Sequence, residues 1–169
     1  MNKFPDNWEI LKFKDIFKKF TYGPRFNASN YDLYGNVKTI RGTDILDSWD
    51  IDYDKVPLAK LDEDIVLNHL LNEGDIVMIT TAECGFSAVF KKQYFPYICS
   101  AYALRLEPNK KVKPQYCVYF LQSEIAKRQV QKYIRKGTVA NLPGSDVMKI
   151  RIPLPPLFEQ EMIAFILSS

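Results

Sequence analysis

Two cations followed by small polar residues form the segment best suited to contact a charged ligand. Arg135 and Lys136 precede Gly137, Thr138 follows the glycine directly, and Asn141 comes three residues after Thr138. Guanidinium and ammonium groups attract phosphate, while hydroxyl and amide side chains can bond to phosphate or to base edges. The same cations could instead complement the negative end of a helix that stops at Lys136-Gly137. The segment therefore has a nucleic-acid-binding and a structural interpretation.

A second polar segment, residues 80–87, follows directly after an apolar run. Thr80, Thr81 and Glu83 are short side chains of the kind that reads DNA, with glutamate accepting a hydrogen bond from cytosine and threonine contacting base or phosphate. The alternative is a polar turn whose hydroxyls satisfy their own backbone. Both interpretations remain open at the level of sequence.

Arg41 and Thr43 stand at the end of a predicted strand, where an arginine can make a bidentate contact with guanine. The alternative for Arg41 is a salt bridge to Asp44 or to the acidic segment that follows. Three lysines complete the set of candidate DNA-binding residues: Lys38, Lys91 and Lys92.

Patterns that would indicate catalysis are missing from the sequence. No loop of the Asn-Pro-Pro-aromatic type is present, and Asn141-Leu142-Pro143-Gly144 lacks the second proline and the aromatic residue. No acidic residue is followed two positions later by lysine, and there is no phosphate-binding loop or nucleophile elbow. Cys84 and His69 are more simply explained as structural residues than as nucleophile and base. We therefore expect no catalytic activity and no cofactor.

Bulk composition describes an ordinary globular domain. The 169 residues are 47% apolar and 25% charged, which suits one domain with its own core. No apolar run is long enough to span a membrane and the N-terminal residues lack the core of a signal peptide, so we expect a cytoplasmic protein without membrane contact. Three cysteines and one histidine give little support for a metal site, and none is predicted.

Charge is unevenly distributed although the net charge is only +3. Residues 44–64 are strongly acidic, and the rest of the chain carries short basic clusters such as Lys110-Lys111 and Lys127-Arg128. Such clusters on one face would supply the phosphate attraction that dominates DNA affinity, whereas scattered clusters would be solvated surface.

Hydrophobic periodicity predicts an α+β domain with a twisted mixed sheet packed by helices. Strands are expected over residues 8–13, 37–41, 76–80, 88–90 and 98–106. Helical structure is expected over residues 14–20 and 115–134, a hairpin turn at Gly35-Asn36, and an irregular surface loop over residues 44–61.

The C-terminal segment predicts a further helix. Pro155 and Pro156 favour a start near Pro156, because proline suits the first helical turn. About three turns follow, too few for a stable isolated helix, so its apolar side is expected to pack against a partner. The predicted interface residues are Leu157, Met162, Ile163, Ile166 and Leu167.

These C-terminal residues carry a resemblance to a known family. Gly137-Thr138-Val139, Asn141-Leu142 and the run from Ile152 to Leu157, followed by Glu159-Gln160, resemble the end of a target-recognition domain of type I restriction-modification specificity (S) subunits, the HsdS family. Trp8-Glu9-Ile10, residues 34–45 and residues 73–77 are similar to earlier parts of such domains. Residues 22–25, Tyr-Gly-Pro-Arg, depart from the glycine- and threonine-rich turn usual in the family.

The resemblance implies a target-recognition domain over residues 1–152 and the start of a conserved spacer helix over residues 153–169. It implies a non-catalytic module that reads one half of a bipartite duplex DNA target. Its partners would be methyltransferase (M) subunits, the restriction (R) subunit through the complex, and a second recognition domain. The chain would be a piece of a longer subunit or a half-subunit that pairs. The alternatives are the recognition part of a methyltransferase or nuclease, and a helix-mediated protein-interaction module.

Overall fold

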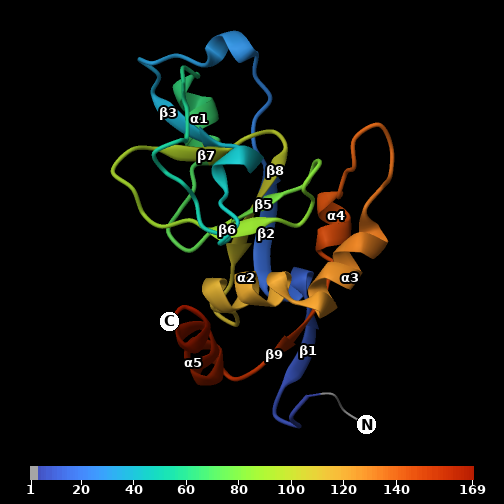
Figure 1. Ribbon diagram of the computed structural model, residues 1–169. Helices are drawn as coiled ribbons and strands as arrows, with labels where there is room; N and C mark the ends of the chain where they lie inside the picture. Colours follow the sequence, from blue (N-terminus) through green and yellow to red (C-terminus); the bar gives the residue numbers. More distant parts are fainter. Residues whose placement is uncertain (1–3) are drawn as a thin grey trace.

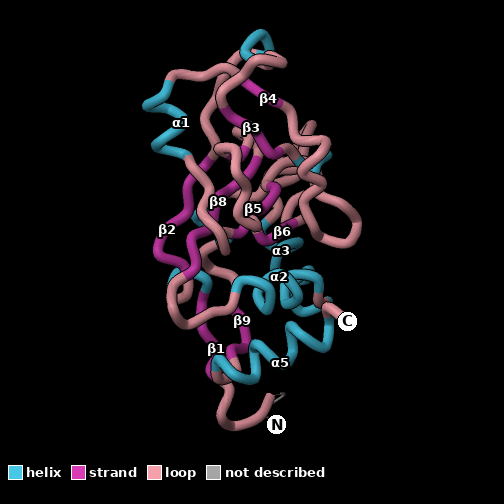
Figure 2. The backbone as a smooth tube through the Cα atoms, turned by 90° about the vertical axis from the view of Figure 1, so that its left-hand side faces the viewer, coloured by secondary structure: helices cyan, strands magenta, loops and turns pink. Residues whose placement is uncertain are grey.

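The computed structural model describes residues 4–169, so the first three residues of the predicted domain 1–152 lie outside the described range. Figures 1 and 2 show strands in the upper part of the molecule, helices α2 and α3 below them, and the pair β1 and β9 beside α5 at the lower end. The predicted α+β class is confirmed. The strands, however, are divided among three sheets.

The described strands are short. They are β1 (Glu9–Lys12), β2 (Phe17–Tyr22), β3 (Val37–Ile40), β4 (Leu58–Ala59), β5 (Ile76–Ile79), β6 (Ser87–Val89), β7 (Tyr97–Cys99), β8 (Ala103–Pro108) and β9 (Arg151–Leu154). The α-helices are α1 (Glu63–His69), α2 (Pro114–Gln122), α3 (Glu124–Tyr133), α4 (Gly144–Val147) and α5 (Leu157–Leu167). Three-residue 3₁₀ turns cover Phe13–Asp15, Ala28–Asn30 and Gly42–Asp44.

The central sheet has the order β2-β8-β5-β6 and is antiparallel throughout. A second sheet, β4-β3-β7, joins β3 to β4 antiparallel and to β7 in parallel. In the third, β1 pairs with β9, and this pairing crosses the predicted boundary between residues 152 and 153. The single strand expected over residues 98–106 is therefore wrong, because the chain turns after Cys99 and passes from one sheet to another.

Strand β5 explains why its sequence is continuously apolar. Successive side chains of a strand point to opposite faces, and here both faces are covered. Ile76 and Met78 join a core formed with β8, α2 and β9, whereas Val77 and Ile79 join a second core formed with β3, β6 and β7. All four β5 residues are buried, as a central strand requires.

The Gly74-Asp75 step before β5 has a structural role. Gly74 adopts a φ of +88°, which favours glycine, and Asp75 turns back to accept hydrogen bonds from Asn72 N (2.7 Å) and from Nε of Arg105 on β8 (2.6 Å). Burial raises the pKa of the Asp75 carboxyl, and these donors oppose the rise. The step thereby links the turn to the neighbouring strand.

Two helix predictions need correction. Residues 14–20 form a 3₁₀ turn followed by β2, because pairing with β8 outweighs local helical preference. Residues 115–134 form α2 and α3 rather than one helix. The break is at Ser123, whose extended backbone (ψ 154°) ends α2 and whose Oγ accepts from Ala126 N, capping α3. Helix α3 ends at Tyr133, before Lys136-Gly137.

Segment 44–61 is mostly irregular, as predicted, but it does not lie wholly at the surface, which is a further correction. Ile45, Ile51 and Val56 are buried in the second core, and Ala59 lies in β4. Its apolar residues pack against Val77 and Ile79 of β5 and Ala88 of β6, while most of its carboxylates point to solvent. The turn at Gly35-Asn36 likewise precedes β3, but the antiparallel partner of β3 is β4, so the expected hairpin is absent from the described part of the chain.

No helix of the described residues is both long and apolar enough to cross a membrane.

Candidate nucleic-acid interface

The two strongest polar segments of the sequence lie against each other in the structure. Arg135 and Asn141 exchange backbone hydrogen bonds (2.8 and 3.1 Å) and so close a loop of residues 136–140, which projects between α3 and α4 in Figure 1. Asn141 also forms a bridge with Thr81, and Ala82 N donates to Ala140 O (3.0 Å). We call residues 135–141 the cationic loop. Its cations therefore come directly after Ile134, the C-cap of α3, and the backbone of Arg135 is paired with Asn141.

Side chains of the cationic loop are exposed. Arg135 is 71% exposed, and Lys136, Thr138 and Asn141 also face solvent. Arg135 Nη2 lies 3.6 Å from Asp146 Oδ2. An exposed ion pair at this distance is weak, so the guanidinium can still contact another group.

Asp146 of α4 contacts both Lys149 and Arg135, the first residue of the cationic loop. Lys149 Nζ donates to Asp146 Oδ1 at 2.7 Å. This hydrogen bond lowers the pKa of the Asp146 carboxyl and raises the pKa of Lys149. At neutral pH the carboxylate therefore stays charged and holds both Lys149 and Arg135 near α4.

Thr80 does not fit the predicted direct contact with DNA. It is 1% exposed, and its Oγ1 donates to Tyr102 O at 3.1 Å. Because Thr80 continues the central strand β5, its side chain is enclosed by the β7–β8 turn. Thr81 is half-buried and Glu83 is exposed, and both remain accessible beside the cationic loop.

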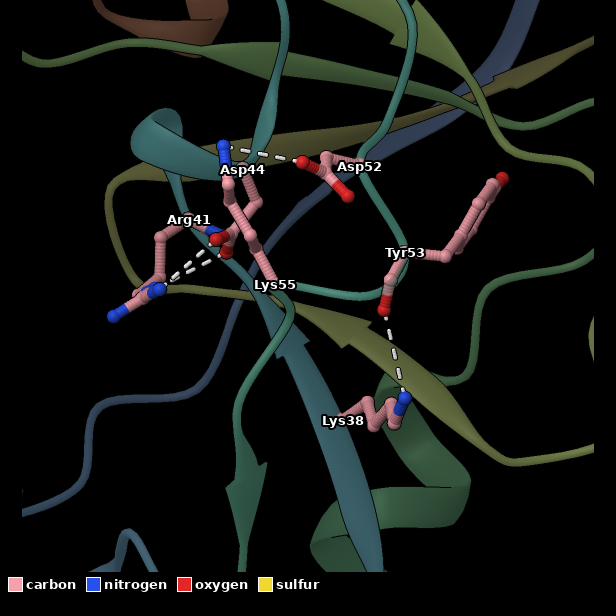
Figure 3. Close-up of polar contacts among 6 residues, drawn as sticks. All are labelled: Lys38, Arg41, Asp44, Asp52, Tyr53 and Lys55. Carbon is pink, nitrogen blue, oxygen red and sulfur yellow. Dashed lines mark hydrogen bonds and ion pairs between the residues drawn. The ribbon is translucent and has the colours of Figure 1, made fainter.

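Arg41 forms the salt bridge that was the structural alternative for this residue (Figure 3). Its Nε and Nη2 donate to the two oxygens of Asp44 at 3.1 and 2.9 Å, and its backbone N donates to the same carboxylate at 2.8 Å. Asp44 is fully buried, whereas the Arg41 side chain is 42% exposed. Hydrogen bonding to Asp44 raises the pKa of Arg41. The guanidinium is thus held in one orientation with part of its edge in solvent, and Thr43 beside it is exposed.

Lys38, Lys91 and Lys92 are separated from the cationic loop. Lys38 Nζ approaches Tyr53 O (3.5 Å, Figure 3) and lies over the Tyr97 ring. Lys91 and Lys92 belong to the loop between β6 and β7, which is on the left in Figure 1 while the cationic loop is on the right. The structure therefore divides the predicted cations into two groups.

Two exposed aromatic residues next to these candidates are absent from the predicted set. Tyr102 occupies the turn between β7 and β8, and Tyr22 ends β2; their exposed fractions are 66% and 42%. The Tyr22 hydroxyl accepts a hydrogen bond from Gly144 N (2.8 Å). The exposure of Tyr102 could not be predicted, because the residue lies inside an apolar run that predicts a single strand.

The two residues weighed as nucleophile and base lie in different parts of the fold, His69 in α1 and Cys84 in the loop between β5 and β6. His69 lies in α1, where Nδ1 approaches Ile65 O at 2.8 Å, and Cys84 Sγ donates to Thr80 O at 3.2 Å, so the two do not contact each other. Burial raises the pKa of the Cys84 thiol, which disfavours the reactive thiolate. Within residues 4–169, no group of three or more His, Cys, Asp and Glu side chains is arranged so that it could hold a metal ion.

The apolar side chains of α5 are divided between the domain and solvent. Ile163 packs against the first core, and buried Gln160 accepts from Lys113 N (2.8 Å) and donates to Lys111 O and Pro155 O (3.0 and 2.9 Å). The other predicted interface residues of the helix, together with Phe158 and Phe165, are exposed by 43–72%. Most of the predicted interface thus remains uncovered by the described chain.

The fold is shared with part of a solved HsdS subunit. The HsdS subunit from Thermoanaerobacter tengcongensis aligns with a TM-score of 0.71 and 18% identity, covering 99% of this chain and 38% of that subunit.

Similarity at the level of sequence agrees with this fold. The putative type I restriction enzyme MjaX specificity subunit of Methanocaldococcus jannaschii is 32% identical over 180 residues, covering 99% of this chain and 40% of the relative. The StySPI specificity subunit of Salmonella potsdam is 24% identical over 169 residues, covering 96% of this chain and 36% of the relative. The chain therefore spans well under half the length of these relatives. The profile of the type I restriction modification DNA specificity domain matches residues 5–169, and the chain belongs to that family.

Proposed function

We propose that this chain is a non-catalytic DNA-recognition module that reads one half of a bipartite duplex target. The observation that carries the proposal is the bridging of Thr81, Asn141 and Arg135, which places exposed cations and small polar side chains on one surface. Cations supply phosphate attraction that does not depend on sequence, and short polar side chains read base edges. Membership in a family of DNA specificity domains supports this assignment.

Two sets of residues would divide the work of DNA binding. The cationic loop, with Thr81 and Glu83, would lie on one side of the contact surface, and Arg41 with Thr43 on the other. Lys38, Lys91 and Lys92 would add long-range attraction or meet a more distant part of the duplex. Thr80 would act only through the backbone it supports.

Helix α5 would provide the contact with the rest of the assembly. Its exposed apolar residues suit other helices, either of a second recognition domain or of a methyltransferase subunit, and residues 153–169 would begin the spacer between two recognition domains. The restriction subunit would be reached only through the complex. This arrangement assigns recognition to the domain and assembly to its last helix.

Duplex binding over a salt series tests the proposal. We expect the 169-residue chain to bind random-sequence duplex DNA weakly, with an affinity that falls steeply as salt is added. Replacing both Arg135 and Lys136 with alanine should reduce the slope of log affinity against log salt by roughly 0.9 for each phosphate contact removed.

The matched control is the double substitution of Lys110 and Lys111 with alanine. These lysines follow β8 at the end opposite Tyr102, so their removal changes net charge equally and should leave most of the slope unchanged. A salt response that is flat for the unaltered chain would reject DNA recognition and favour the protein-interaction alternative. Methyl transfer from a labelled donor to duplex DNA by the chain alone would reject the non-catalytic assignment.

A further inference from the structure

Tyr102 is a large aromatic side chain exposed on a rigid turn. It is 66% exposed, although the residues on either side of the turn, Cys99 and Ala103, are buried. An exposed aromatic ring on a mobile loop needs no explanation, since single apolar residues are common on surfaces. A ring on a fixed backbone can bind a partner at low cost, because little conformational entropy of the backbone remains to be lost on binding.

Hydrogen bonds from the end of β5 fix the backbone of Tyr102. Thr80 donates from both its backbone N (3.0 Å) and its Oγ1 (3.1 Å) to Tyr102 O. On the other side of the residue, Tyr102 N donates to Ser100 Oγ (3.3 Å) and Ala103 N donates to Ser100 O (3.1 Å). Both backbone polar groups of Tyr102 are therefore occupied within the turn.

The ends of β3 and β2 hold the same turn from two further directions. Ser100 N donates to Ile40 O at 2.8 Å, and Gly23 N donates to Ala103 O at 3.2 Å. Gly23 is packed so closely that a Cβ atom there would lie 2.0 Å from Cys99 O and 2.2 Å from Ser100 O. This contact gives a role to residues 22–25, whose sequence departs from the family pattern: they support the turn that carries Tyr102.

The position of the turn connects the two sets of candidate DNA-binding residues. Arg41 follows Ile40, which accepts the hydrogen bond from Ser100, and Thr81 follows Thr80, which donates to Tyr102. Thr81 is bridged in turn to Asn141 of the cationic loop. Tyr102 thus stands between the Arg41 side and the Arg135 side of the surface, where a bound duplex would cross.

We propose that the ring of Tyr102 contacts base edges in a groove of the bound duplex, and that Thr80 is its positioning residue. This inference rests on the proposed function. The ring would bury apolar surface against groups such as a thymine methyl, the type of contact that distinguishes bases, while the flanking cations hold phosphates. Recognition at this point would not need the Tyr102 hydroxyl.

Substitutions of Tyr102 test the role of the ring. Duplexes enriched from a random pool by the unaltered chain would be used as the specific probe, and the random pool as the non-specific probe. We expect Tyr102→Ala to weaken binding to the enriched duplex by about tenfold, with little change toward the random pool. Tyr102→Phe should bind like the unaltered chain. The matched control, Tyr94→Ala, removes a fully exposed tyrosine from the β6–β7 loop and should change neither.

Thr80→Val tests the positioning role. It should weaken binding to the enriched duplex less than Tyr102→Ala does, and it should relax preference at the same base positions. In the Tyr102→Ala background it should have no further effect on DNA binding, even though any loss of fold stability would persist. Independent, additive losses in DNA affinity would show that Thr80 does not act through Tyr102.

The outcomes separate this inference from the proposed function. If the unaltered chain enriches no sequence and its binding is insensitive to salt, the proposed function fails and the inference falls with it. If enrichment succeeds and Tyr102→Ala binds the enriched duplex normally, only the inference about Tyr102 is wrong. If Tyr102→Ala keeps its DNA binding but no longer binds a methyltransferase subunit, the ring makes a protein contact instead. An equal loss in Tyr102→Phe would transfer the role to the hydroxyl and overturn the ring contact.

Discussion

Carboxylates hold both arginines of the candidate surface, but to different degrees. Arg41 donates hydrogen bonds to both oxygens of the buried Asp44 carboxylate, whereas Arg135 forms one ion pair with Asp146 at 3.6 Å. A guanidinium fixed in this way can contact a base or phosphate with its remaining donors and loses less freedom on binding. A salt bridge and a DNA contact are therefore compatible for Arg41.

Replacing Arg41 with lysine should separate these two contributions. An ammonium group cannot span both oxygens of Asp44, so we expect the free energy of unfolding to fall by about 1 kcal/mol, a value reduced by solvent screening at a 42% exposed side chain. Chemical denaturation measures the change. Lys55→Ala, which breaks the exposed pair with Asp52 seen in Figure 3, should change stability by less than about 0.5 kcal/mol. Equal effects of the two substitutions would contradict the special role of the buried carboxylate.

Single residues show where sequence reasoning succeeds and where it ends. Residue type alone singles out the cationic loop and Thr81, and the structure shows that the two are adjacent and accessible, while their contact with DNA stays a prediction. The burial of Thr80 and the exposure of Tyr102 could not be predicted, because each depends on where a strand ends. Thr80 is buried because it extends β5 by one residue, and Tyr102 is exposed because a turn interrupts the apolar run 98–106.

At the scale of elements, the segments whose pattern was strong are the ones that the structure confirms. The continuous apolar run of β5, strand β1 and the helix after Pro156 all lie where the sequence predicts them. Strand β2 and the division of α2 from α3 depend instead on tertiary pairing and on one serine cap. Helix α1 was missed because its seven residues, Glu63–His69, fall among acidic residues that suggest a loop.

The Asp75–Arg105 pair links two central strands and should be important for stability. Asp75→Asn leaves Arg105, which is only 10% exposed, without its nearest charged partner. Glu107 remains 3.5 Å from Arg105, but a buried charge that loses its closest partner is costly, so we expect a loss of about 3 kcal/mol in the free energy of unfolding. Denaturant titration would measure it, with Lys18→Ala at the exposed end of the same ion-pair chain as the control. If Asp75→Asn is no more harmful than Lys18→Ala, the turn does not depend on this pair.

At the scale of the whole molecule, the candidate DNA surface and the exposed side of α5 lie at opposite ends of the central strands. β8 begins beside Tyr102 and ends at Pro108, and the segment after it binds Gln160 of α5 through Lys111 and Lys113. The two antiparallel strands β5 and β8 therefore form a rigid connection between the candidate DNA surface and the exposed helix.

Substitutions on the two sides of α5 should separate folding from assembly. Ile163→Asp places a charge against the first core and should reduce the free energy of unfolding by about 2 kcal/mol or more. Phe165→Asp changes a side chain that is 72% exposed and should alter stability by less than about 0.5 kcal/mol while reducing association with partner helices. Thermal unfolding and sedimentation velocity measure the two properties. Normal association by Phe165→Asp would exclude this side of α5 from the interface.

The contrast between the two turns on the candidate surface has a consequence for how target preference changes over time. The β7–β8 turn is hydrogen-bonded to the ends of three other strands, so we expect insertions there to disturb the sheet and the side chain of residue 102 to be the part that can change. Hydrogen bonds fix the cationic loop at its two ends, and residues 136–139 are exposed. This loop can gain or lose residues without reaching the core. Under the proposed function, new specificities should thus arise by exchange of single side chains at one turn and by changes of length at the other.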